Sequence, residues 1–199
     1  MRRPGATRTD QAAACGHGPA LRLAVGLVLV GAAGLAATGP HPAAPEYAVK
    51  AAFVYNFAKF VEWPKRAPAA LAPELRICVL GADPFAGVLD EIVAGKTIGE
   101  RTMAVARVER VSETAGCAVV YVSASEGPRL RSVLAAFRGR PVLTVGDTDG
   151  FAEAGGIIGL FLEDNRVRFE INVEAADEAH LTISSRLLSL GRLVNGQGR

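Results

Sequence analysis

Asp147, Asp149 and Gly150 follow an apolar run and are the residues best spaced for catalysis. Two carboxylates placed in this way after a strand can serve a phosphatase, in which one attacks phosphorus and the other transfers protons. That chemistry also needs a lysine further along the chain, and the last lysine is Lys96. Because Asp and Gly are common turn residues, we predict a loop here. A Mg²⁺-dependent hydrolase using Asp147 and Asp149 is kept as an alternative.

Other catalytic and metal-binding patterns are incomplete. An EF-hand starting at Asp147 needs glycine at position six and glutamate at position twelve, but Gly150 is fourth and Ile158 is twelfth. The last two histidines are His41 and His180, too few for a nucleophile–histidine site or a histidine-based metal site. We therefore predict that the protein is not an enzyme and that it has no metal and no cofactor.

The amino-terminal residues have the composition of a signal peptide. Four arginines precede or border an uncharged apolar stretch from Leu23 to Ala37, and small residues and prolines follow it. This order is typical of secretory signals. A retained anchor is the alternative, although a bilayer-spanning helix needs roughly 20 apolar residues. We expect residues 1–44 to be a cleavable signal peptide and flexible exit, and residues 45–199 to be one exported, periplasmic domain.

The charge of the exported part differs from that of the whole chain. The full sequence has 22 Lys and Arg against 20 Asp and Glu, but four of the basic residues and one acid precede Pro45. The part that follows is therefore close to −1. Proteins that bind nucleic acid usually carry a basic surface, so nucleic acid is not among the predicted partners.

Two cysteines lie in the predicted exported domain, Cys78 and Cys117. In an oxidising compartment such a pair indicates a disulfide first, with two buried free thiols or a redox couple as alternatives. By chain entropy, a bridge that closes a loop of about 40 residues contributes roughly 4 kcal/mol. Each cysteine falls in a predicted strand, so pairing of these strands would allow the bridge.

The segment from Val49 to Pro64 stands out because it holds five of the twelve aromatic residues. At 100° per residue most of its apolar side chains share one arc, which predicts an amphipathic helix covering a sheet. Pro64 is expected to end the helix, because proline disfavours the α region for the residue before it. Lys50 is an exception within the apolar arc and must either reach solvent or find an acid.

Strands and helices alternate after this helix. Short β-branched runs predict strands at 75–81, 102–111, 117–124, 140–147, 157–163 and 166–173, and apolar periodicity predicts helices at 83–95, 127–139 and 183–194. Asp164 and Asn165 form a tight turn between the last two strands. This order predicts an α/β fold: a single three-layer domain, with a mostly parallel sheet, a C-terminal antiparallel hairpin and helices on both faces.

Two long segments resemble the signatures of one known family. The helix at Val49–Pro64 is similar to the first signature, and residues 155–176 followed by 181–194 are similar to the second. The family is the YfiR/HmsC-like family of periplasmic regulators, and the resemblance spans Glu46 to Val194. It implies a protein that binds and represses an inner-membrane diguanylate cyclase, which lowers cyclic di-GMP and limits biofilm and exopolysaccharide.

The resemblance also implies partners and particular residues. The implied partners are the periplasmic part of the cyclase and an outer-membrane lipoprotein that sequesters the repressor. Cys78 and Cys117 match the family's bridge, whereas Ala152 and Gly159 stand where some relatives have a second cysteine pair. The family's late hairpin faces the cyclase, which implies a partner-binding role for Ile158 and Glu170 here.

A protein that acts by contact is expected to expose aromatic residues and arginines. The candidates for partner binding are Tyr55, Trp63, Arg166 and Arg168. An accessory protein of exopolysaccharide export is the alternative function from another class. A homodimer is left open.

Overall fold

The computed structural model describes residues 44–67 and 72–195, and the observations below concern these ranges. The predicted signal peptide lies outside the described residues except at position 44. Within the described ranges, no helix has both the length and the apolar character needed to cross a bilayer.

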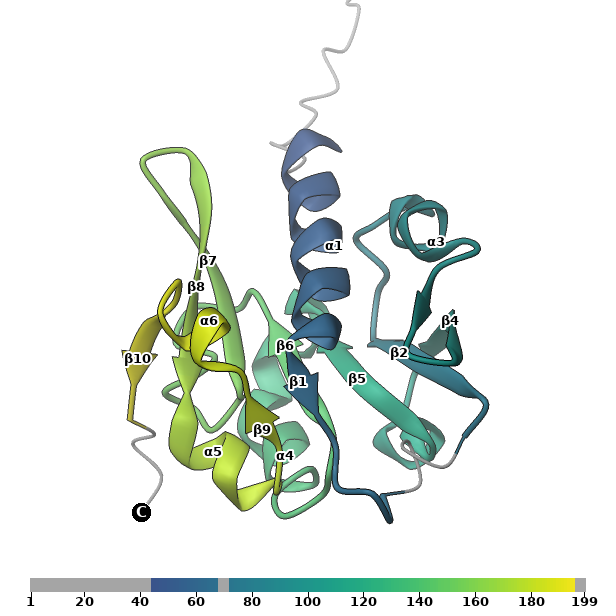
Figure 1. Cartoon of the computed structure of the whole chain (residues 1–199). Coiled ribbons are helices and arrows are strands. Elements are labelled where there is room, and N and C mark those ends of the chain that lie inside the picture. The colour runs from purple at the N-terminus through teal and green to yellow at the C-terminus, as the bar shows by residue number, and fades with distance from the viewer. Residues whose placement is uncertain (1–43, 68–71, 196–199) are drawn as a thin grey trace, which may run out of the picture. The chain divides into compact units, whose positions relative to one another are not determined.

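A mixed sheet of eight strands forms the centre of the fold (Figure 1). Its spatial order is β10-β8-β7-β6-β5-β2-β4-β3. The pairs β7–β8 and β4–β3 are antiparallel, and the other five neighbouring pairs are parallel. The strands are β2 (Glu74–Leu80), β3 (Thr97–Ile98), β4 (Arg101–Val108), β5 (Cys117–Val122), β6 (Leu143–Gly146), β7 (Ile158–Glu163), β8 (Arg166–Asn172) and β10 (Arg192–Val194).

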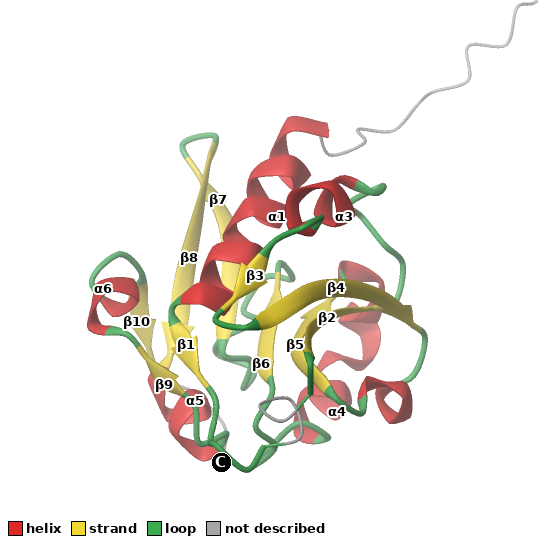
Figure 2. Ribbon diagram, turned by 45° about the vertical axis from the view of Figure 1, so that its right-hand side comes forward, coloured by secondary structure: helices red, strands yellow, loops and turns green. Residues whose placement is uncertain are grey.

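Helices cover both faces of the sheet (Figures 1 and 2). Ile77 and Val79 of β2 join one apolar core with α1 (Ala44–Lys59) and α3 (Val88–Val93). Cys78 and Leu80 point to the opposite face and join a second core with α4 (Leu130–Ala135). All of β5 is buried, as expected for a central parallel strand with both faces covered. The three-layer α/β prediction is confirmed.

The first helix ends earlier than predicted. It stops at Lys59, and Val61–Glu62 form the short strand β1, which pairs antiparallel with β9 (Thr182–Ile183). The expectation that the helix continues to Pro64 is therefore wrong. Of the apolar side chains in the predicted helix, Val54 and Phe57 are buried, whereas Val49 is 45% exposed.

The other three helix predictions are also too long, and the α-helix predicted at 127–139 is observed only as α4, from Leu130 to Ala135. The helix predicted at 83–95 begins only at Val88, because the Asp83 carboxylate accepts a hydrogen bond from the backbone of Phe85 at 2.8 Å and caps a turn instead. The helix predicted at 183–194 is reduced to α6 (Ser185–Leu188), after which the chain extends into β10. Gly191 lies between α6 and β10, and the Phe169 ring occupies the space that a side chain at position 191 would need.

The β7–β8 hairpin extends past its neighbours in the sheet (Figure 1). β6 pairs with β7 only at Ile158 and Gly159, so the distal half of the hairpin consists of two strands. Asp164 and Asn165 have φ angles of 49° and 58°, the left-handed values that a two-residue type I′ turn requires. The predicted tight turn is confirmed.

Candidate functional site

The disulfide joins two neighbouring strands of the sheet. Cys78 of β2 and Cys117 of β5 are bonded, with their Cα atoms 5.9 Å apart. Both residues are buried, in the core beneath α4. The two parallel strands are therefore fixed to each other covalently as well as by their hydrogen-bond ladder, and the predicted disulfide is present in the fold.

The most concentrated polar cluster lies where α1 crosses the carboxyl end of β6. The Asp147 carboxylate accepts hydrogen bonds from the Tyr47 hydroxyl at 2.9 Å and from the Lys50 ammonium at 2.7 Å. Lys50 also pairs with Glu46, one turn earlier on the same helix. The side chains of Lys50 and Asp147 are only 6% and 3% exposed, so this is a buried ion pair.

The hydroxyl of Tyr121, on β5, belongs to the same buried region. Burial raises its pKa, and the charge of Asp147 raises that pKa further, yet the hydroxyl makes no aligned hydrogen bond. The pKa of Tyr47 is raised for the same two reasons. The cluster therefore holds two tyrosines with raised pKa values around the Lys50 ammonium group and the carboxylates of Asp147 and Glu46.

This arrangement explains Asp147 without catalysis. A nucleophilic carboxylate must reach a substrate, but the Asp147 side chain is covered by α1 and bonded to Tyr47 and Lys50. Asp149 is exposed and lies apart from this bonded cluster. Among the described residues, no group of three His, Cys, Asp or Glu side chains could hold a metal ion.

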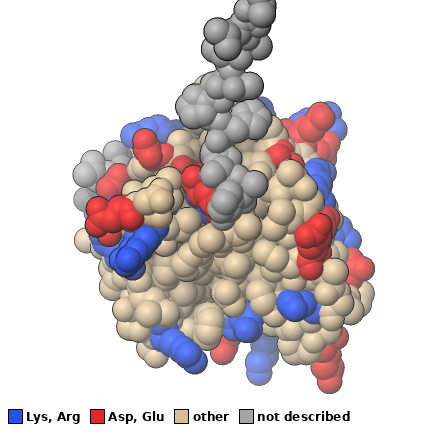
Figure 3. All heavy atoms as spheres, turned by 90° about the horizontal axis from the view of Figure 1, so that it is seen from above, with Lys and Arg blue, Asp and Glu red and all other residues tan. Residues whose placement is uncertain are grey.

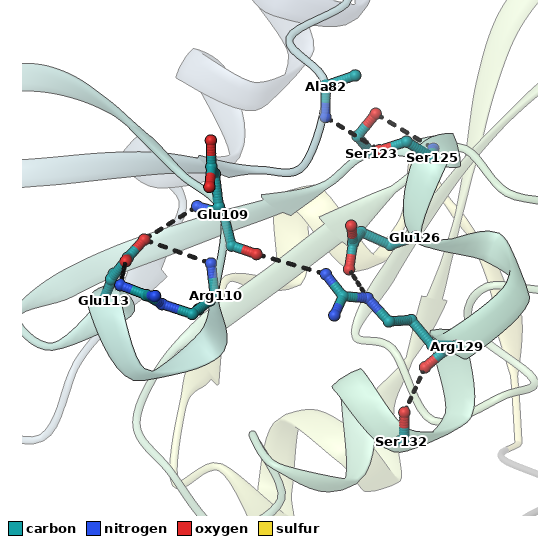
Figure 4. Close-up of polar contacts among 9 residues, drawn as sticks. All are labelled: Ala82, Glu109, Arg110, Glu113, Ser123, Ser125, Glu126, Arg129 and Ser132. Carbon is teal, nitrogen blue, oxygen red and sulfur yellow. Dashed lines mark hydrogen bonds and ion pairs between the residues drawn. The ribbon is translucent and has the colours of Figure 1, made fainter.

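A second polar cluster occupies the carboxyl ends of β2 and β5, shown in Figure 4. The strand order changes direction between these strands, a place where open α/β sheets commonly bind ligands. Here Ser125 accepts a hydrogen bond from the backbone of Ala82 at 3.0 Å, and the Glu126 carboxylate lies against Gly81. Glu126 is buried and pairs with Arg129 at 2.6 Å, so the side chains of Ser125 and Glu126 occupy the space beside Gly81 and Ala82 at the end of β2.

Three of the predicted partner-binding residues are buried. Trp63 is 9% exposed, and its indole N–H donates to the backbone oxygen of Ala118, so the expectation of an exposed tryptophan is wrong. Ile158 is fully buried, and the Glu170 carboxylate is held by Arg192 at 2.6 Å. A partner could therefore touch these three side chains only after a rearrangement.

The other predicted residues lie at the surface. Arg166 and Arg168 are exposed on the hairpin, and the Nε atom of Arg168 is 3.8 Å from the Glu163 carboxylate. Tyr55 is half-buried on α1, with the ammonium groups of Lys59 and Lys96 within 5.4 and 5.9 Å of its ring centroid. On the face seen in Figure 3, acidic and basic side chains are interspersed around a broad uncharged surface.

A groove that the sequence did not indicate lies beside these arginines. It has a volume of about 410 Å³ and is lined by Phe53, Phe161, Glu163, Val167, Arg168, Phe169, Leu190 and Arg192. Leu190 is 70% exposed, and Leu193 further along β10 is 56% exposed. Because residues 183–194 were predicted to form one helix from their apolar periodicity, the sequence pointed away from this groove.

The fold and these two clusters define an α/β domain that is fixed by one disulfide and by the buried ion pair of Lys50 and Asp147. Residues 47–192 match the YfiR/HmsC-like family, and the chain belongs to that family. Its members are known as periplasmic regulators of diguanylate cyclases. A search of curated proteins gives no match.

Two similar solved structures share little sequence with this chain. One is the ABC domain in complex with L-Trp from Streptococcus pneumoniae, at 13% identity and a TM-score of 0.46, covering 60% of this chain and 55% of that one. Another is a conserved domain protein from Vibrio cholerae O1 biovar El Tor, at 11% identity and a TM-score of 0.48, covering 74% and 59%. The chain thus spans little more than half of either protein.

Proposed function

We propose that this protein is an exported regulator that binds the periplasmic part of an inner-membrane diguanylate cyclase and restrains its activity. The observation that carries this proposal is the family match, which extends over residues 47–192 and so takes in nearly all of the described domain. Repression would lower cyclic di-GMP and thereby limit biofilm and exopolysaccharide.

Two features of the domain support action by contact. The carboxylate best placed for chemistry, Asp147, is bonded to Tyr47 and Lys50 beneath α1. Exposed arginines and a partly apolar groove lie together on the β7–β8 hairpin, a composition that suits protein interfaces.

The disulfide between Cys78 and Cys117 suits an oxidising compartment such as the periplasm.

The test is the cellular level of cyclic di-GMP in the native host after deletion of the gene. We expect a rise on deletion, and a return to the starting level when the wild-type gene is restored. The predicted outer-membrane lipoprotein partner would counteract the restored gene when overproduced. If deletion leaves cyclic di-GMP unchanged while the partner cyclase is expressed, the regulator proposal is wrong. Stable association with an export complex would then favour the accessory function.

A further inference from the structure

The distal half of the β7–β8 hairpin has an open edge on each side. β10 pairs with β8 only at Glu170, Ile171 and Asn172, and β6 pairs with β7 only at Ile158 and Gly159. Beyond these residues the hairpin is a two-stranded ribbon (Figures 1 and 2). An open strand edge presents unpaired N–H and C=O groups and can accept a further strand.

The hydrogen bonds within the hairpin decide which residues present these groups. The N–H of Asn172 donates to the backbone oxygen of Ile157 at 2.8 Å, so the backbone of Asn172 faces β7. Along an antiparallel strand, every second residue faces the same neighbour. Val167 and Phe169 are five and three positions before Asn172, so their N–H groups point away from β7. They point to the outer edge of β8, on the side where β10 begins.

The groove of about 410 Å³ lies along this outer edge. One side of its lining is apolar: the rings of Phe53 and Phe169 have centroids 5.6 Å apart, and the exposed Leu190 lies beside them. The backbone edge and the apolar surface are therefore next to each other. A strand added at this edge would place alternate side chains against this apolar lining.

The remaining lining carries two arginines and one glutamate. Arg192 is paired with the buried Glu170. The Nε atom of Arg168 is 3.8 Å from the Glu163 carboxylate, and the side chains of Arg168 and Glu163 are both more than half exposed. An exposed pair at this distance compensates charge only weakly. The groove therefore favours a carboxylate on the partner, which Arg168 can bind.

We propose that the outer edge of β8 at Val167–Phe169 binds an extended segment of the partner by strand addition. The segment pairs its backbone with Val167 and Phe169, places an apolar side chain against Phe53 and Leu190, and directs a carboxylate to Arg168. That this partner is the periplasmic part of the cyclase rests on the proposed function. The backbone edge commits the proposal to an extended segment, since a helix has no free ladder groups to offer.

A pair of proline variants tests the edge directly. Val167→Pro removes one outward N–H of β8 and leaves the bonds between β7 and β8 in place, because those are made by the alternate residues. Leu162→Pro is the matched control: Leu162 is the cross-strand partner of Val167, and its N–H points to the opposite edge of the same ribbon. We expect Val167→Pro to bind the purified periplasmic part of the cyclase about tenfold more weakly, as for one lost hydrogen bond. We expect Leu162→Pro to bind it like the wild type.

The same variants are then compared for cyclic di-GMP in the deletion strain. If the wild type itself does not lower cyclic di-GMP, the proposed function fails and the assigned partner falls with it. If Val167→Pro represses as well as the wild type, the edge proposal is overturned while the function stands. It is also overturned if both proline variants fail equally, since the ribbon as a whole is then required.

A charge-reversal pair covers the case in which Val167→Pro does not fold, as judged by circular dichroism. Arg168→Glu changes a residue of the groove, and Arg131→Glu changes an exposed arginine on α4 that is not part of the lining. We expect only Arg168→Glu to weaken binding. Light scattering decides the remaining occupant: a wild-type dimer that Val167→Pro dissociates would assign the edge to a second copy and overturn the proposal.

Discussion

Lys50 and Asp147 form a buried ion pair that ties the first helix to the carboxyl end of β6. Their side chains meet at 2.7 Å although the residues are 97 positions apart. The Tyr47 hydroxyl donates to the same carboxylate, so two residues three positions apart on α1 bond to one acid at the end of β6. The aromatic helix is thus positioned by a charge as well as by its apolar face.

Removing the ammonium group should be costly. Lys50→Met keeps most of the side-chain volume but leaves Asp147 buried with only the Tyr47 hydroxyl as its partner. Breaking a buried pair in this way typically costs about 3 kcal/mol or more, because the remaining charge is not compensated. Urea unfolding of the variant and the wild type measures this loss in the free energy of unfolding.

Lys59→Met is the control for this prediction, because Lys59 lies exposed on the same helix. Surface changes of this kind usually alter the free energy of unfolding by less than about 0.5 kcal/mol. Equal stabilities of the Lys50 and Lys59 variants would show that the pair does not hold α1 in place.

Gly159 should resist substitution because Glu170 occupies the space beside it. A Cβ atom at position 159 would lie 3.0 Å from an Oε atom of Glu170 and 3.1 Å from its Cγ atom, closer than ordinary contacts. Gly159→Ala should therefore displace the carboxylate that holds Arg192 and loosen β10 from β8. We expect a loss of about 1–3 kcal/mol in stability and faster hydrogen exchange in β10.

Gly127→Ala provides the comparison, since a Cβ atom there meets only the Thr148 methyl group at 3.9 Å. This variant should be neutral in both measurements. Unchanged exchange in β10 of Gly159→Ala would mean that the sheet accommodates the methyl group without moving Glu170.

The central strands could be predicted from the sequence because their burial is continuous. β5 reads as a run of apolar residues, and the alternation in β8 gives its exposed and buried sides correctly as far as Phe169. The end of the chain was predicted wrongly, because Leu187 and Leu190 have helical spacing. In the fold Leu187 is buried and Leu190 is exposed, since the helix stops at Leu188 and β10 pairs with β8 instead.

The candidate site was predictable only in part. The helical pattern predicts that Lys50, on the apolar face, must either reach solvent or find an acid, but nothing in the local pattern points to Asp147, which lies close to it only through the fold. Trp63 was misassigned because a helix to Pro64 would have exposed it, whereas the actual strand β1 turns it inward onto Ala118. The groove beside β8 depends on where β10 stops pairing, which is a tertiary property.

The disulfide should contribute strongly to stability and should be protected from reductants in the folded state. It closes a loop with a sequence separation of 39, and both of its cysteines are buried. Cys78→Ala with Cys117→Ala should lower the free energy of unfolding by about 4 kcal/mol, the chain-entropy value for a loop of this length. Free-thiol labelling of the wild type in reductant should be slow in buffer and fast in urea, and rapid labelling in buffer would contradict this burial.

Acid should weaken one surface network in a predictable direction. Hydrogen bonds from Arg107 hold the pKa of the Asp90 carboxyl below its ordinary value in the folded protein. A carboxyl whose folded-state pKa is lowered adds stability above its unfolded pKa of about 3.9, and loses that contribution as the pH falls through the folded value. Because the Asp90 side chain is 44% exposed, we expect the contribution to be below about 1 kcal/mol.

The measurement is urea unfolding of the wild type and Asp90→Asn at neutral pH and at a series of values between about pH 5 and pH 2. The wild type should be the more stable at neutral pH, and the difference should shrink below about pH 4, where the unfolded carboxyl begins to take up its proton. Arg107→Gln should abolish most of this pH dependence as well, since it removes the donor. A difference that grows as the pH falls would have the wrong sign for a lowered pKa and would show that Arg107 does not stabilise the charged form of Asp90.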